Sequence, residues 1–194
     1  MLPPLSPPRF VNDEPALTAV LDGIKLVSCP HCRQTGALIG HGHLRGYSER
    51  GSERVVRGRR VFCSNRGRRT GCGRTFSVTL ATVLCGFLVH TLTLWNFASA
   101  VVRGLSRRAA WLLAAGSALS LTSGYRLWRR LGTAQCALRA RLCRELPAPP
   151  STAREPLAQL FAHLGLVVGG GDAPVISNPF AVFQQHLQCG LFDA

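Results

Sequence analysis

A chain of 194 residues is long enough for one compact domain or for two small ones. Its formal net charge is +14, with 23 basic residues against nine acidic ones, which favours a polyanion such as nucleic acid as partner. The acidic residues are scattered, and no glycine-rich loop is followed by Lys-Ser or Lys-Thr. This pattern argues against two-metal strand-transfer chemistry and nucleotide hydrolysis, so we expect neither catalysis nor a small-molecule substrate.

Residues 1–25 are expected to form an N-terminal arm. Residues 1–15 are proline-rich, which predicts a disordered or loosely packed segment, and residues 16–25 resemble a short helix. The start of the chain lacks the basic and apolar segments of a signal peptide. Four of the eight cysteines have no regular spacing, which argues against a secreted disulfide scaffold: Cys85, Cys136, Cys143 and Cys189. A reduced bacterial cytoplasm fits better, with the protein associated with the nucleoid.

Residues 26–80 have the layout of a small antiparallel zinc ribbon. Apolar and basic residues alternate in 37–47 and 53–62, a turn separates these segments, and residues 73–78 are long enough for one more strand. Cysteines lie on either side of these predicted strands. Because such a piece is too small to bury a core, we expect bound Zn²⁺ to supply the folding free energy.

The predicted zinc ligands are Cys29, Cys32, Cys63 and Cys72. Two residues between Cys29 and Cys32 let both sulfurs converge on one ion. The second pair has an irregular eight-residue gap, and residues 64–71 are interpreted as an inserted loop. Free thiols or a disulfide remain the alternative. So does replacement of one ligand by another residue, the candidates being His31, His41, His43 and Cys85.

Residues 75–102 contain no charged residue and are long enough to span a bilayer. Five threonines, His90 and Asn96 would make a poor lipid-facing surface, so helices buried against each other are the favoured interpretation. A small membrane protein with a cytosolic zinc domain is the less favoured alternative.

Residues 88–146 are predicted to form a helix-turn-helix-like domain. A first helix follows Leu92, and Ser106 is placed to cap a second helix that Gly116 ends. A third helix covers about 121–131, with Gly124, Leu127, Trp128 and Leu131 on its inner face, and a fourth runs from Gly132 to Leu146.

The outer face of the predicted third helix carries hydroxyls at its start and guanidinium groups behind them. Such a face suits the major groove, where hydroxyls and one arginine contact bases and further arginines contact phosphates. A solvated basic face on a structural helix is the alternative. The candidate DNA-binding residues are Arg57, Arg59, Arg60, Arg68 and Arg69 of the ribbon, Arg107 and Arg108 of the second helix, and Thr122, Ser123, Arg126, Arg129 and Arg130 of the third.

Residues 147–194 are predicted to be a C-terminal helical tail. Thr152 and Glu155 have the spacing of a capping box for a helix that ends before Gly165. The glycines at 169–171 predict a flexible break, and Asn178-Pro179 begins a last helix that Gly190 stops. These helices are expected to pack against the domain or to mediate homo-oligomerisation.

Three segments resemble a known family: Cys29-Pro30-His31-Cys32, Gly71-Cys72-Gly73-Arg74-Thr75-Phe76, and residues 120–131. They are similar to the zinc-ribbon and helix-turn-helix region of bacterial insertion-sequence transposases and their short accessory proteins. The resemblance implies a four-cysteine zinc site and a trihelical unit that together recognise DNA. The gap between Cys63 and Cys72 departs from the family pattern, and nothing that resembles the family's catalytic domain follows.

The sequence therefore predicts an α+β chain in which a zinc ribbon precedes a mainly helical domain. The expected function is non-catalytic, zinc-dependent binding of double-stranded DNA by a transposon-associated accessory factor or regulator. A separate transposase subunit is a further expected partner. The alternative is a zinc-ribbon adaptor that binds RNA or an acidic protein.

Overall fold

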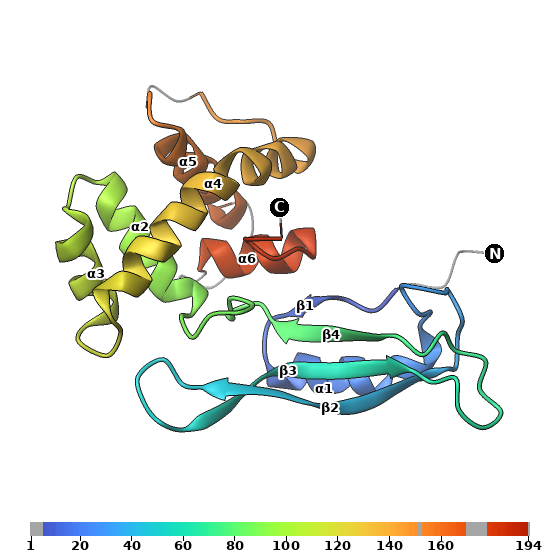
Figure 1. Cartoon of the computed structure of the whole chain (residues 1–194). Helices are drawn as coiled ribbons and strands as arrows, with labels where there is room; N and C mark the ends of the chain where they lie inside the picture. Colours follow the sequence, from blue (N-terminus) through green and yellow to red (C-terminus); the bar gives the residue numbers. More distant parts are fainter. Residues whose placement is uncertain (1–5, 151–152, 170–177, 194) are drawn as a thin grey trace. The chain divides into compact units, whose positions relative to one another are not determined.

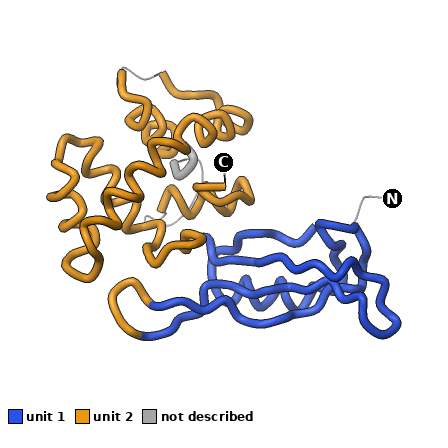
Figure 2. The backbone as a smooth tube through the Cα atoms, in the orientation of Figure 1, with its two compact units in different colours: residues 1–47, 53–81 blue, residues 48–52, 82–194 orange. Residues whose placement is uncertain are grey.

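The computed structural model describes residues 6–150, 153–169 and 178–193. They form an α+β structure in two compact units, as the sequence predicts for the fold class (Figure 2). Unit 1 consists of Met1–Tyr47 and Glu53–Ala81, and unit 2 consists of Ser48–Ser52 and Thr82–Ala194. The tip of the first hairpin therefore belongs to the helical unit.

Unit 1 is built on a four-stranded mixed sheet with the strand order β1-β4-β3-β2 (Figure 1). Strand β2 (Leu38–Tyr47) pairs antiparallel with β3 (Arg54–Cys63), which pairs antiparallel with β4 (Thr75–Leu80). Strands β2 and β3 lie within one residue of the two alternating segments, whereas β4 begins and ends two residues later than the predicted strand 73–78. The fourth, β1 (Phe10–Val11), runs parallel to β4, so the expectation of a purely antiparallel sheet was wrong.

The N-terminal segment is more ordered than its proline content suggests. Phe10 and Val11 are buried, and the carbonyl groups of Arg9 and Val11 accept hydrogen bonds from the N–H groups of Thr79 and Ala81. Helix α1 (Glu14–Asp22) begins after Asp13, whose carboxylate accepts from the N–H of Ala16 at 2.8 Å. Burial of Phe10 and Val11 and their pairing with the edge of β4 thus order this segment, although prolines surround it.

A small apolar core lies in unit 1, contrary to the expectation that the ribbon buries none. Helix α1 packs against β1, β3 and β4, and a short 3₁₀ turn (Ile24–Leu26) follows it. The buried apolar side chains include Leu17, Ile24, Leu38, Val61 and Val78. A metal ion would therefore add to this core rather than replace it.

Unit 2 contains five helices in its described part: α2 (Thr91–Val102), α3 (Arg107–Ala115), α4 (Leu121–Glu145), α5 (Pro156–Gly169) and α6 (Pro179–Leu187). Their apolar faces meet in one cluster that includes Phe97, Trp111, Leu127 and Phe180. Figure 1 shows the long helix α4 beside the shorter helices of this unit. Ser106 caps α3 and Gly116 ends it at a φ of +61°, as predicted.

The predicted third and fourth helices are one continuous helix, α4. Gly132 lies in its interior at a cost of about 1 kcal/mol relative to alanine. The buried stripe continues in register on both sides of this glycine, from Leu127 and Leu131 to Leu138 and Leu142. Burial of these leucines stabilises the helix by more than one glycine costs, because each contributes about 1.5–3 kcal/mol.

The C-terminal helices also differ in their bounds. Helix α5 continues through Gly165 to Gly169, and α6 ends at Leu187, before Gly190, with Gln188 in the left-handed region. Asn178 caps α6, as the Asn-Pro pair predicts. Thr152 and the predicted glycine break beyond residue 169 lie outside the described residues.

Across the described ranges, the structure has no helix with both the length and the apolarity needed to cross a membrane. The uncharged stretch 75–102 is divided between β4, a loop and the 12-residue helix α2. The length of an uncharged stretch therefore did not correspond to the length of any one helix.

Candidate metal centre and basic face

Four cysteine sulfurs from distant parts of unit 1 lie together. The Sγ atoms of Cys29, Cys32, Cys63 and Cys72 all lie within 4.8 Å of one another, with 3.8 Å between Cys29 and Cys72 and 3.7 Å between Cys32 and Cys63. Zinc–sulfur bonds of about 2.3 Å place the sulfurs of a tetrahedral site about 3.8 Å apart. A disulfide needs about 2 Å between sulfurs. The cluster can therefore hold a metal ion, and all four cysteines are free thiols.

The first ligand turn is shaped by its backbone. The N–H of His31 points at Cys29 Sγ at 3.4 Å, and the N–H of Arg33 donates to the carbonyl of Cys29 at 2.8 Å. Cys29 in turn donates its N–H to the carbonyl of Gln34. Arg33 follows the second cysteine in the left-handed region, with a φ of +62°, which turns the chain back toward the sheet.

The second ligand turn repeats these backbone contacts despite its irregular spacing. The N–H of Gly73, the residue after Cys72, donates to the carbonyl of Cys63, and the N–H of Cys63 donates to the carbonyl of Arg74. Gly73 has a φ of +73°, which corresponds to the conformation of Arg33. The N–H of Cys72 also points at Cys63 Sγ at 3.3 Å. Cys63 and Cys72 thus form the second half of a pseudo-symmetric site.

The residues between Cys63 and Cys72 leave this turn intact because the loop is closed at its base. The N–H of Gly71 donates to the carbonyl of Ser64 at 2.9 Å. A Cβ on Gly71 would collide with the Ser64 carbonyl and lie 2.7 Å from Cys63 Sγ, so glycine is required there. The interpretation of 64–71 as an inserted loop agrees with this geometry, and Cys72 reaches the other three sulfurs.

None of the alternative ligands belongs to this cluster among the residues that the structure describes. The ring of His31 meets Phe76 edge-on, and that of His41 lies against Phe62. His43 is 2.7 Å from the guanidinium of Arg59, measured from Nε2 to Nη1. Cys85 lies outside unit 1.

The environment of the sulfurs differs from one to the next. A backbone hydrogen bond from Gln34 lowers the pKa of Cys32 to about 7, whereas burial raises the pKa of Cys63 to about 12. Cys29 and Cys63 are fully buried. A bound cation would favour the thiolate at every position. Four sulfur donors at tetrahedral separations suit Zn²⁺ or an iron–sulfur centre rather than a hard cation.

The ribbon arginines fall into two groups. Arg57 occupies a bulge in β3, with its aliphatic stem over Gly46, and Arg59 lies beside His43, so both are half-buried. Three predicted DNA-contacting residues are exposed: Arg60 on β3, and Arg68 and Arg69 in the inserted loop. The exposed group is better placed to meet a polyanion.

Helix α4 presents an exposed stripe opposite its buried leucines. Thr122, Arg126, Arg129 and Thr133 are exposed and follow one another at i, i+4, i+7 and i+11, which places them on one face of the helix. Thr133 is not among the residues predicted from the sequence, because a new helix is predicted to begin at Gly132. The same periodicity, carried through the glycine, would have identified it.

Four other predicted DNA-contacting residues on the helices have partners or lie apart from this stripe. The Ser123 hydroxyl lies 3.1 Å from that of Ser120, within the N-cap of α4. The guanidinium of Arg107 lies over the ring of Trp128 at 5.6 Å. Arg130 flanks the stripe, and Arg108 is exposed at the start of α3.

Helices α3 and α4 meet at a close contact. A Cβ on Gly124 would lie 2.6 Å from Cδ2 of Trp111, so only glycine permits this approach without a shift. The indole N–H of Trp111 donates to the carbonyl of Leu119 at 3.3 Å, in the turn that joins the helices. The turn therefore fixes the direction in which α4 leaves α3.

No family model, no curated protein and no solved structure matches this chain significantly. The resemblance to transposase-associated proteins thus rests on the three sequence segments alone.

Proposed function

We propose that this chain is a non-catalytic, zinc-dependent protein that binds double-stranded DNA. The observation that carries the proposal is the exposed stripe of Thr122, Arg126, Arg129 and Thr133 on a helix whose opposite face is buried. This stripe combines the Thr122 hydroxyl with the guanidinium groups of Arg126 and Arg129, which are donors suited to base edges and phosphates. The Thr133 hydroxyl donates to the carbonyl of Arg129 instead, at 3.1 Å. Helices α2, α3 and α4 would act as the helix-turn-helix-like unit.

The cysteine cluster supports the same proposal. Four thiolates on one Zn²⁺ would hold both ligand turns together. Because Cys63 and Cys72 lie at the two ends of the inserted loop, the same ion would also close the loop that carries Arg68 and Arg69. Those exposed guanidinium groups, with Arg60, would contact phosphates without reading sequence. Zinc would thus have a structural role, because four protein ligands leave no open position for chemistry.

A role in transposition, with a separately encoded transposase as partner, remains part of the proposal on the strength of the sequence resemblance. An adaptor that binds RNA or an acidic protein is the competing function. Both functions use the basic surface, so the test must separate duplex DNA from RNA.

The test is binding of the zinc-loaded full chain to a pool of random duplexes, followed by selection of the bound sequences. We expect log K to fall linearly with log salt between about 50 and 200 mM, and a preferred sequence to emerge. Arg126→Ala should reduce discrimination between sequences, whereas Arg68→Gln should weaken binding to all of them. Exposed Arg144 at the end of α4 provides the control, since Arg144→Gln should alter neither property. A salt slope near zero, or tighter binding to RNA of equal length, would contradict the proposal.

A further inference from the structure

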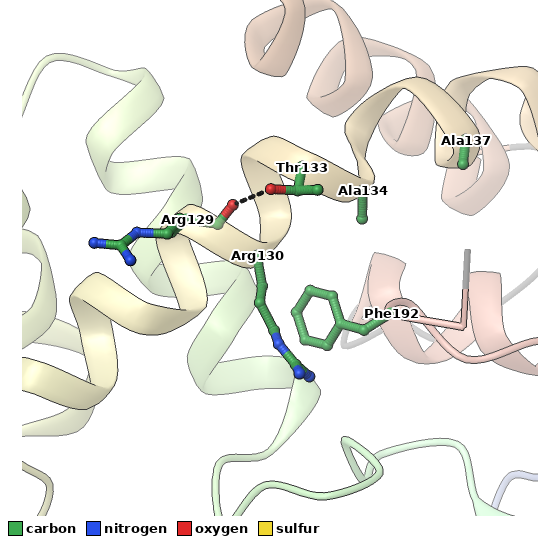
Figure 3. Close-up of a pocket in the computed structure, with 6 residues that line it drawn as sticks. All are labelled: Arg129, Arg130, Thr133, Ala134, Ala137 and Phe192. Atoms are coloured by element: carbon green, nitrogen blue, oxygen red, sulfur yellow. Dashed lines mark hydrogen bonds between the residues drawn. The ribbon is translucent and has the colours of Figure 1, made fainter.

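Two cavities lie along one side of α4, and both are lined by Arg129 and Arg130. One, of about 300 Å³, is completed by Thr133, Ala134, Ala137 and Phe192 (Figure 3). The other, of about 370 Å³, is completed by Gly86, Phe87 and Arg126. Both cavities are basic, because two arginines line the first and three line the second.

Arg130 is held between these cavities by two aromatic rings. Its guanidinium carbon lies 5.1 Å from the centroid of Phe87 and 6.0 Å from that of Phe192. The two rings lie 5.5 Å apart and are inclined at 59°. Guanidinium groups within about 6 Å of an aromatic face are attracted to it. The rings therefore limit the positions that this long side chain can adopt, which lowers the entropy that binding would cost.

Aromatic contacts position Arg130 but do not neutralise it. Among the described residues, the contacts of its guanidinium are with the two rings and not with a carboxylate. Asp193, the next residue after Phe192, directs its carboxylate at the N–H of Gly190 at 3.2 Å. Because Arg130 is also exposed, its guanidinium donors can reach an external acceptor.

The alanines leave room for such an acceptor. Ala134 and Ala137 line the cavity beside Arg130 with side chains of one carbon each. In Figure 3 the Arg130 side chain extends toward the Phe192 ring, whereas the Arg129 guanidinium points away from it. The Thr133 hydroxyl donates to the carbonyl of Arg129 at 3.1 Å, so Arg130 is the principal donor on this side.

We infer that the cavity beside Arg130 binds one phosphate group of the DNA backbone, next to the bases that α4 reads. Phosphate fits because it is anionic and accepts two parallel hydrogen bonds from a guanidinium fork. This inference rests on the proposed function and extends it. Phe192 becomes a positioning residue, so the C-terminal segment after α6 belongs to the DNA-binding surface rather than to packing alone.

The first test measures duplex binding by the zinc-loaded full chain. Arg130→Gln should reduce the slope of log K against log salt by about one and weaken binding to every sequence alike. Ala137→Leu fills the cavity without changing charge and should weaken binding several-fold. Arg144→Gln and Ala140→Leu, at exposed positions that do not line the cavity, are the matched controls.

Phe192 is tested separately because its role is indirect. Phe192→Leu keeps an apolar side chain but removes the ring, so affinity should fall while the salt slope stays near that of the wild type. A rescue variant, Phe192→Tyr, restores the ring and should restore affinity. A purely structural role would instead lower the melting temperature of Phe192→Leu and leave duplex affinity unchanged once the protein is folded.

The second test uses pyrophosphate as a probe that needs no DNA. Pyrophosphate should raise the melting temperature of the wild type and of Arg144→Gln, but not that of Arg130→Gln.

If the wild type binds duplex DNA while Arg130→Gln and Ala137→Leu keep its slope and affinity, the phosphate site is wrong and the proposed function stands. If the wild type binds no duplex, the proposed function fails. A pyrophosphate effect abolished by Arg130→Gln would then support the anion site, and no effect would overturn both.

Discussion

Gly124 of α4 lies directly against the indole of Trp111 in α3, at a distance that leaves no room for a methyl group. Trp111 is almost fully buried, so its ring has no free space into which to move. This one contact sets how closely the two helices of the proposed reading unit can approach. Its consequences are open to measurement.

Gly124→Ala should destabilise the protein by about 1–3 kcal/mol, because the added methyl overpacks a filled core. Gly132→Ala is the matched control in the same helix, since nothing lies within 4 Å of the added atom. That change should stabilise α4 by up to about 1 kcal/mol through helix propensity. Chemical denaturation of both variants checks the prediction. Equal stabilities for the two would show that α3 and α4 are less closely packed.

Cys63→Ser should reduce the metal content from one ion per chain to nearly none, because Cys63 donates one of four sulfurs at tetrahedral separations. Elemental analysis of the purified, reduced protein measures this. Cys136→Ser removes an exposed cysteine of α4 and serves as the control, which should keep its metal. A metal-free wild type would disprove the predicted zinc site.

Gly71→Ala should weaken metal binding although it leaves all four cysteines in place. The added Cβ would lie 2.7 Å from Cys63 Sγ and meet the Ser64 carbonyl, so the loop could no longer close at its base. Competition with a chromogenic chelator gives the affinity. Gly40→Ala in β2 adds its methyl to open space and should retain the wild-type affinity.

Glu49→Gln should destabilise unit 2 by about 1 kcal/mol, the usual effect of losing a helix cap. The Glu49 carboxylate accepts from the N–H of His90 at 3.0 Å and from the Thr93 hydroxyl at 2.8 Å, while His90, the N-cap residue of α2, makes no side-chain capping bond. The glutamine keeps the shape but loses the negative charge that favours a helix N-terminus. Thermal unfolding measures the change, with exposed Glu53→Gln as the control; identical melting temperatures would contradict the capping role.

Local patterns predicted much of the cysteine cluster and the helix starts. Cys29-x2-Cys32 converges on one point by its spacing alone, and Ser106 and Asn178 cap helices through bonds to nearby N–H groups. Such features depend on a few neighbouring residues, so a short window of sequence contains the relevant physics. The inserted loop was recognised for the same reason.

Other features depended on contacts between distant residues. Phe10 and Val11 form a strand only because β4 offers them an edge, and Gly132 stays helical only because the leucines on both sides of it are buried together. Arg130 packs against Phe87 and Phe192, which lie 43 and 62 residues away along the chain. A short window of sequence around Arg130 contains neither of these aromatic residues, so the contacts could not be predicted from it.

The sequence by itself determined the residue types, the charge and the spacing of the ligand pairs, because these need no knowledge of distant contacts. Only the tertiary structure decided that Cys72 completes the cluster and that α4 is one helix. It also decided that the rings of Phe87 and Phe192 pack against Arg130. The physical reason is that burial and close approach depend on which surfaces meet, and a local pattern of residues does not specify its partner.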